Sequence, residues 1–270
     1  MIKKIIYKIS GVESIYESLN PIFYLSKLFT KIFVKINGKK IINGPFTGME
    51  LKHSSRGSEY MPKYLGTYES ELYKTINSFC SNNNNKLIID IGADDGYYSI
   101  GIAKLINKGT ILSYELNSES CIQLKRNIDL NRNFFNNQKK IEVINKKLND
   151  YGDLKQFLKN NDFNSILVKV DIEGGEYELF TDDFVNSLSA LPIMIIIETH
   201  FDPNAELKLI KRLKSFSFEV NVIDKVMQNF LSKTFNLNFI SKSILSLFWL
   251  RWTSEHRPKY NRWIIAKINK

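Results

Sequence analysis

One short segment constrains the fold of this chain more than any other. Residues 87–91 are apolar except for Asp90, and they lead into a loop that contains Gly92 and Gly96 before a helical pattern begins at Tyr97. In α/β proteins, a strand, a glycine-containing turn and a helix present a nucleotide-like ligand at the carboxyl end of the first strand. The segment therefore predicts a parallel sheet with a ligand site at this turn.

The chain after residue 86 repeats the same alternation. Apolar segments predict strands at 86–91, 110–115, 140–145, 165–171, 192–198, 217–223 and 261–268, and amphipathic spacing predicts helices at 97–106, 118–132, 152–160, 175–187 and 204–215. Repeated strand–helix units with apolar strands predict an α/β, Rossmann-like fold, with a mostly parallel seven-stranded sheet and helices on both faces.

The first 80 residues follow a different pattern. We expect an N-terminal extension over residues 1–80, with two short helices within 1–34 and a β-hairpin around Asn37-Gly38. The asparagine run 82–85 marks the boundary to a second unit over residues 81–270. Within that unit, the apolar and aromatic segment 225–252 is long for a connection, which predicts a helical insertion or cap.

Charge and cysteine content narrow the class of protein. The net charge is +10, but the lysines are dispersed and form no block of five like charges, which disfavours nucleic acid as a partner. Two cysteines without metal-ligand spacing indicate no disulfide framework, and we expect a cytoplasmic protein. No apolar run reaches the roughly 18–20 residues of a spanning helix, while the basic, amphipathic residues 1–34 leave a peripheral membrane contact open.

The loop that contains Gly92 and Gly96 is acidic, and its charge restricts which class of ligand it can bind. Asp90, Asp94 and Asp95 would repel the diphosphate of a dinucleotide, whereas they would attract a sulfonium and an ammonium. Gly92 and Gly96 allow the backbone to approach the ligand closely. This combination favours S-adenosylmethionine as the cofactor.

Three further positions are expected to bind this cofactor. Glu115 lies at the end of the second predicted strand, 25 positions after Asp90, where an acidic residue binds ribose hydroxyls. Asp150 follows the third strand and could meet the adenine amino group, although a turn explains it equally well. The helix that begins at Tyr97 offers backbone N–H groups to a carboxylate.

Acidic residues and a histidine follow the fourth and fifth predicted strands. Asp171 ends the segment 165–171 and Glu173 follows it. Glu198 ends the segment 192–198 and His200 follows it, so all four are expected at one edge of the sheet beside the cofactor. Methyl transfer to a hydroxyl requires a base, for which Asp171 or His200 is the candidate, with Glu173 and Glu198 positioning the acceptor. A divalent cation could occupy these carboxylates instead, but we expect no metal.

These motifs together resemble the FkbM-like S-adenosylmethionine-dependent methyltransferases. The resemblance covers residues 86–200 and rests on four stretches: Asp90–Ser99, Glu115, Val168–Glu176 and Ile197–His200. Members of that family commonly carry Asn where this chain has Asp94. The resemblance implies a class I methyltransferase fold with Asp171 beside the cofactor. It also implies O-methylation of a small-molecule or glycan acceptor, such as a sugar, a glycan or another natural product.

Further stretches resemble a less characterised bacterial branch of the family. They are Gly44–Met49, Tyr64–Glu69 and Glu255–Pro258 with Trp263. The resemblance implies that Tyr68 and Glu69 close over the methionine end of the cofactor. Trp263 and segment 225–252 could stack against a sugar, although core packing is the favoured interpretation.

Two other classes of protein are the alternatives to a methyltransferase that acts on hydroxyls. One is a non-catalytic module that holds the cofactor and docks to a membrane or a glycan, against which the intact carboxylate set argues. The other is a nucleic-acid methyltransferase, but Asp171-Ile-Glu-Gly stands where base N-methylating enzymes carry an Asn/Asp-Pro-Pro-aromatic motif. A nicotinamide dehydrogenase is disfavoured because residues 92–96 give no GxGxxG.

Overall fold

The structure of the chain is a computed structural model, and it describes residues 30–52, 60–149, 151–188, 191–200, 202–223 and 262–268. The first expected helix, the insertion 225–252, Asp150 and the stretch Glu255–Pro258 lie outside the described residues. Among the residues that are described, no helix is long and apolar enough to cross a membrane.

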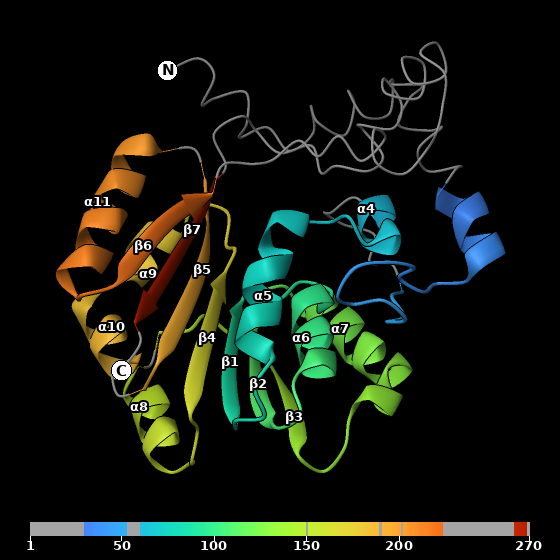
Figure 1. Cartoon of the computed structure of the whole chain (residues 1–270), viewed down its shortest axis with the longest axis horizontal. Helices are drawn as coiled ribbons and strands as arrows, with labels where there is room; N and C mark the ends of the chain where they lie inside the picture. The colour runs from blue at the N-terminus through green and yellow to red at the C-terminus, as the bar shows by residue number, and fades with distance from the viewer. Residues whose placement is uncertain are drawn as a thin grey trace.

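A seven-stranded sheet forms the centre of the molecule (Figure 1). Its strands lie in the order β3-β2-β1-β4-β5-β7-β6, with β7 antiparallel to both of its neighbours and the other paired strands parallel. Their bounds are β1 Lys86–Ile91, β2 Gly109–Tyr114, β3 Lys139–Ile144, β4 Ser165–Val170, β5 Ile193–Thr199, β6 Glu219–Ile223 and β7 Arg262–Ile268. The predicted mostly parallel α/β sheet is confirmed.

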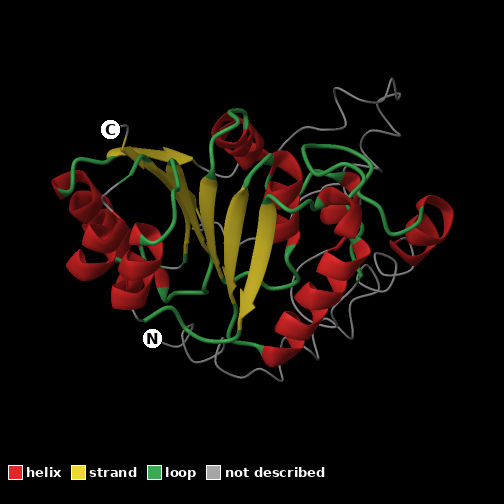
Figure 2. Ribbon diagram, turned by 90° about the horizontal axis from the view of Figure 1, so that it is seen from below, coloured by secondary structure: helices red, strands yellow, loops and turns green. Residues whose placement is uncertain are grey.

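Helices cover both faces of the sheet (Figure 2). One face carries α5 Tyr73–Cys80, α6 Tyr97–Leu105 and α7 Ser118–Leu130, followed by the short η2 Arg132–Phe134. The other carries α8 Tyr151–Lys159, α9 Glu176–Leu179, α10 Asp182–Leu188 and α11 Pro203–Ser215. The central strands β1 and β5 are buried along their whole length, because helices exclude water from both faces.

The order of strands reverses between β1 and β4. The chain runs outward from β1 to β3 and then returns to β4 on the opposite side of β1. At such a switch point the connections leave the strand ends in opposite directions, so the carboxyl ends of β1 and β4 are open to a ligand. The acidic loop after β1 and Asp171 after β4 both lie there.

Two predicted elements take a different form. The single helix expected over 175–187 consists of α9 and α10, because Thr181 begins a new helix by accepting a hydrogen bond from the Phe184 N–H at 3.2 Å. The hairpin expected around Asn37-Gly38 is wrong at that position. Residues 30–37 are helical and Gly38 ends the helix with φ 73°, which glycine adopts at low cost; the antiparallel pairing is a single bridge between Lys40 and Glu50.

The segment before β1 packs into the same core as the sheet. Besides α5 it contains α4 Tyr60–Leu65 and η1 Ser70–Leu72. The Phe46 ring is buried against Tyr97 and Tyr98 at the start of α6, and Gly101 leaves room for it, since a Cβ there would lie 2.6 Å from the ring. The hydrophobic core therefore continues across the sequence boundary predicted at residues 80–81.

Candidate active site

The loop after β1 is held in a tight turn by backbone contacts. Gly92 has φ 82°, and a Cβ there would lie 1.8 Å from the carbonyl oxygen of Asp171, so only glycine fits this close approach of two strand ends. Asp94 takes the left-handed conformation with φ 44°, which Asn and Asp tolerate better than other side chains. The loop therefore has the shape that the sequence predicts.

Asp90 lies at the base of this loop and is 1% exposed. Its Oδ2 accepts a hydrogen bond from Ser99 Oγ at 2.6 Å, whereas Oδ1 accepts none from any described residue. Burial raises the pKa of Asp90, against the opposing effect of Lys169 and Ser99. A buried acceptor atom without a partner calls for an explanation, and a donor on a bound ligand supplies one.

Glu115 fixes the neighbouring side of the site. Its Oε2 accepts the Asp94 N–H at 3.0 Å and its Oε1 accepts the Asn117 N–H at 2.7 Å. Each carboxylate oxygen can accept a second hydrogen bond, so the side chain can bind hydroxyls while it holds the loop. The Tyr97 ring, by contrast, packs edge-on against Phe46 in the core, and only its backbone lies on the loop.

The acidity of the loop is partly neutralised inside the protein. Lys63 on α4 reaches both carboxylate oxygens of Asp95 at 3.0 Å, and the two side chains are 3% and 1% exposed. Asp95 is thus a buried anchor for the N-terminal segment. The negative charge that this residue adds to the loop is therefore paired inside the protein rather than offered to a ligand.

Lys169 on β4 is a candidate site residue that the sequence did not indicate. Its Nζ lies 3.2 Å from Asp171 Oδ2 and 4.6 Å from the centroid of the Tyr98 ring. Burial disfavours its ammonium, but Asp171, Glu69, Asp90 and Glu198 raise its pKa above the usual value. A lysine inside an otherwise apolar central strand is the signal that could have revealed it.

Glu69 is brought to the same place from the N-terminal segment. It is 5% exposed, has φ 48° and accepts a hydrogen bond from the Tyr98 hydroxyl. Glu69, which the resemblance assigned to the cofactor, therefore lies among the groups around Lys169. Trp263 is 1% exposed and packs in the core, where its indole N–H donates to Glu71 at 3.1 Å.

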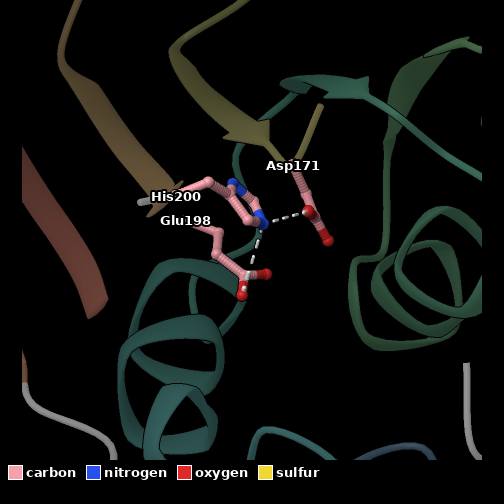
Figure 3. A group of neighbouring side chains, drawn as sticks. All are labelled: Asp171, Glu198 and His200. Atoms are coloured by element: carbon pink, nitrogen blue, oxygen red, sulfur yellow. Dashed lines mark ion pairs between the residues drawn. The ribbon is translucent and has the colours of Figure 1, made fainter. Parts of the chain in front are cut away.

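The strand ends of β4 and β5 bring together the remaining predicted residues (Figure 3). His200 Nε2 lies 3.7 Å from Glu198 Oε1, 3.8 Å from Asp171 Oδ1 and 3.6 Å from Glu173 Oε2. The Glu198 and His200 side chains are buried, the Asp171 side chain is 21% exposed and the Glu173 side chain is 81% exposed. The cluster therefore opens toward solvent on the side of Glu173.

Glu176, the first residue of α9, orients this histidine. The fully buried carboxylate accepts hydrogen bonds through Oε1 from His200 Nδ1 at 2.7 Å and from the His200 backbone N–H at 2.9 Å. A carboxylate only accepts, so Nδ1 carries the proton and Nε2 faces the carboxylates. Burial lowers the pKa of His200, but Glu176, Asp171 and Glu173 outweigh it and raise the pKa.

The fold and the carboxylates at its strand ends, together with the family match given next, define the class of the protein: it is a class I S-adenosylmethionine-dependent methyltransferase. The chain belongs to the FkbM family, because the model of the methyltransferase FkbM domain matches residues 68–235. A search of curated proteins returned no match.

Solved structures similar to the chain include two methyltransferases. The precorrin-6y C5,15-methyltransferase of Geobacter metallireducens is 16% identical, with coverage of 74% of this chain and 89% of that chain and a TM-score of 0.44. The O-methyltransferase of Bacillus cereus in complex with S-adenosylhomocysteine is 14% identical, with coverage of 73% and 80% and a TM-score of 0.44.

The residues at the carboxyl ends of the central strands fit S-adenosylmethionine. The unpartnered Oδ1 of Asp90 can accept from an ammonium, and the lone pairs left on Glu115 can accept from ribose hydroxyls. The buried carboxylates around Lys169 suit a cofactor that carries a sulfonium. Contact with the cofactor stays a prediction for every described residue assigned to it: Glu69, Asp90, Gly92, Asp94, Gly96, Tyr97, Glu115 and Asp171.

Proposed function

We propose that this methyltransferase transfers the methyl group to a hydroxyl of a sugar, a glycan or another small natural product. The observation that carries the proposal is the convergence of Asp171, Glu198 and His200 at one sheet edge, beside the loop after β1. A hydroxyl must lose its proton when it is methylated, and carboxylates with an oriented imidazole provide for that loss.

The chemistry divides between the cofactor and the chain. S-Adenosylmethionine supplies an activated methyl group, whose bond to sulfur breaks with its electron pair staying on sulfur while the acceptor oxygen forms the new bond to carbon. Asp171, Glu198 and His200 hold the acceptor oxygen and receive its proton, which then passes to solvent past the exposed Glu173. Holding the reacting atoms in line is the main contribution of the chain.

The test is a transfer assay with a panel of hydroxyl-bearing acceptors. The full chain is incubated with S-adenosylmethionine carrying a ¹³C-labelled methyl group, and products are detected by mass spectrometry. The chemical shift of the labelled carbon separates a methyl ether from a methylated amine or an ester. Labelled ethers support the proposal, whereas methylation confined to amines or to nucleic acid would overturn it.

A matched pair of substitutions links the activity to the cluster. Glu198→Gln removes one charge inside the cluster, and Glu178→Gln removes one from the exposed surface of α9. We expect the first to abolish most turnover and the second to leave it unchanged. Equal activity of both variants, with binding of S-adenosylhomocysteine preserved, would place the acceptor elsewhere.

A further inference from the structure

The cluster at the ends of β4 and β5 has the composition and spacing of a metal site. One imidazole nitrogen and one oxygen from each of two carboxylates, on His200, Asp171 and Glu198, all lie within 4.8 Å of one another. Atoms bound to a common ion at about 2.0–2.1 Å are separated by at most about 4.2 Å. The separations of 3.7 and 3.8 Å from Nε2 fall within that limit, and rotation of a carboxylate adjusts the remaining pair.

The orientation of His200 is a second and independent sign. Glu176 lies outside the three ligands and fixes the ring through Nδ1, so that Nε2 is directed at Asp171 and Glu198 (Figure 3). Metal-ligating histidines donate their other ring N–H to a carboxylate or a carbonyl in the same way, which fixes the tautomer and raises the basicity of the ligand nitrogen.

The charge around the site favours a cation. Six carboxylates surround two groups that can be positive: they are Glu69, Asp90, Asp171, Glu173, Glu176 and Glu198 around Lys169 and His200, and most of them are buried. His200 is neutral when Nε2 binds an ion, so these carboxylates outnumber the one buried cation, Lys169. S-Adenosylmethionine brings only one net positive charge, so negative charge remains when the cofactor is bound. A divalent ion would reduce that remaining negative charge.

We propose that Asp171, Glu198 and His200 bind one divalent cation, with Glu176 as the positioning residue. This inference rests on the proposed function and revises the expectation that no metal takes part. The mixed set of one imidazole and two carboxylates suits Mn²⁺ or Zn²⁺ better than an all-oxygen ion. Three protein ligands leave coordination positions open for an acceptor.

Such an ion gives the cluster a defined role in the transfer. It acidifies the acceptor hydroxyl and fixes its position. With His200, Asp171 and Glu198 engaged as ligands, the proton leaves to Glu173, whose Oε2 lies 3.6 Å from Nε2 and whose side chain is exposed. Glu173 then returns the proton to water, so the chain is unchanged after each transfer.

The experiment measures binding of Mn²⁺ to the full chain that has first been treated with a chelator, with S-adenosylhomocysteine present. Loss of the electron paramagnetic resonance signal of free Mn²⁺ reports binding, and Zn²⁺ serves as a competitor. We expect one ion per chain. Glu176→Gln should weaken binding by about 10–100-fold, as is typical when the partner of a metal-ligating histidine is changed.

Substitutions separate a metal site from general charge effects. Glu198→Gln should weaken Mn²⁺ binding more than Glu176→Gln does, while Glu178→Gln on the exposed surface should bind Mn²⁺ like the unaltered chain. Calorimetry with S-adenosylhomocysteine identifies variants that remain folded, and His200→Gln replaces Glu198→Gln if the latter does not fold. Unchanged binding in both site variants, or no binding of Mn²⁺ or Zn²⁺ by folded chain, would overturn the proposal.

Failure of the metal site and failure of the proposed function give different results. Methylation of a hydroxyl that continues in excess chelator would overturn the metal proposal and leave O-methylation standing. Conversely, Mn²⁺ binding that depends on Glu198 and His200, without methylation of any hydroxyl acceptor, would support the metal site and overturn the proposed function.

Discussion

Replacement of Lys169 by methionine tests whether one buried ammonium holds the carboxylates of the site in place. Nζ lies 3.2 Å from Asp171 Oδ2, and at that separation an effective dielectric constant of 20 gives an attraction of about 5 kcal/mol. Removal of one partner of a buried ion pair destabilises proteins by about 3–5 kcal/mol, because the other charge stays buried without compensation. The expected loss for Lys169→Met is therefore about 3–5 kcal/mol.

The assay is thermal unfolding of the full chain followed by circular dichroism without cofactor. For a domain of this size, each kcal/mol lowers the melting temperature by about 2–4 °C, so the shift should be roughly 6–20 °C. Binding of S-adenosylhomocysteine should weaken as well, because the carboxylates around Lys169 lose the charge that orders them.

Lys86 provides the matched control, since it is another fully buried lysine at the start of a central strand. Its ammonium lies over the Phe79 ring at 5.1 Å and donates to Asn82, and burial lowers its pKa, in contrast to Lys169. Lys86→Met should change the melting temperature only slightly. The reasoning is refuted if Lys169→Met has the melting temperature of the unaltered chain, or if its melting temperature falls no more than that of Lys86→Met.

Three further predictions follow from the described contacts. Glu115→Ala should weaken binding of S-adenosylhomocysteine by roughly 10–150-fold in calorimetry, because charge-assisted hydrogen bonds contribute about 1.5–3 kcal/mol; unchanged affinity would remove Glu115 from the site. Lys63→Met and Asp95→Asn should each destabilise the fold by about 3–5 kcal/mol, and the double variant should lose clearly less than the sum of the two. Unfolding in urea measures these losses, and additive losses would contradict the pairing. Asp95 outweighs burial and raises the pKa of Lys63 above 10.5, so this contribution should be complete below about pH 10.5 and lost as pH rises through the higher folded value. Burial raises the pKa of Cys80 to about 12 and also raises the pKa of Cys121. Neither thiol should therefore react with a disulfide reagent at pH 8 until the chain is unfolded. Fast reaction of the native chain would show a more open core.

The strands of the sheet could be predicted from sequence because their signal is local. The predicted segment 86–91 matches β1 residue for residue, and 110–115 differs from β2 by one residue at each end. Polar residues on either side of an apolar run mark where the strand begins and ends. The hairpin at Asn37-Gly38 was predicted wrongly for a related reason, since the same dipeptide ends a helix as readily as it turns a hairpin.

The chemistry at the strand ends was predictable in kind. Carboxylates that follow parallel strands must meet at one edge of the sheet, so Asp171, Glu198 and His200 were expected together before their distances were known. Their separation, their burial and the direction of Nε2 were not predictable, because these depend on side-chain partners that no periodicity specifies.

The sequence by itself determined the class of fold, the edge of the sheet that carries the site and the charge that selects the cofactor. The alternation of strands and helices along the chain fixes the first two, and the residue types fix the third. Only the tertiary structure decided which charges remain available. It pairs Asp95 with Lys63 from a segment 32 positions earlier, places Lys169 among four carboxylates, and turns Glu176 from a helix start toward His200. Charges buried in a low-dielectric interior act through their nearest partners, and the folded chain alone decides which residues those are.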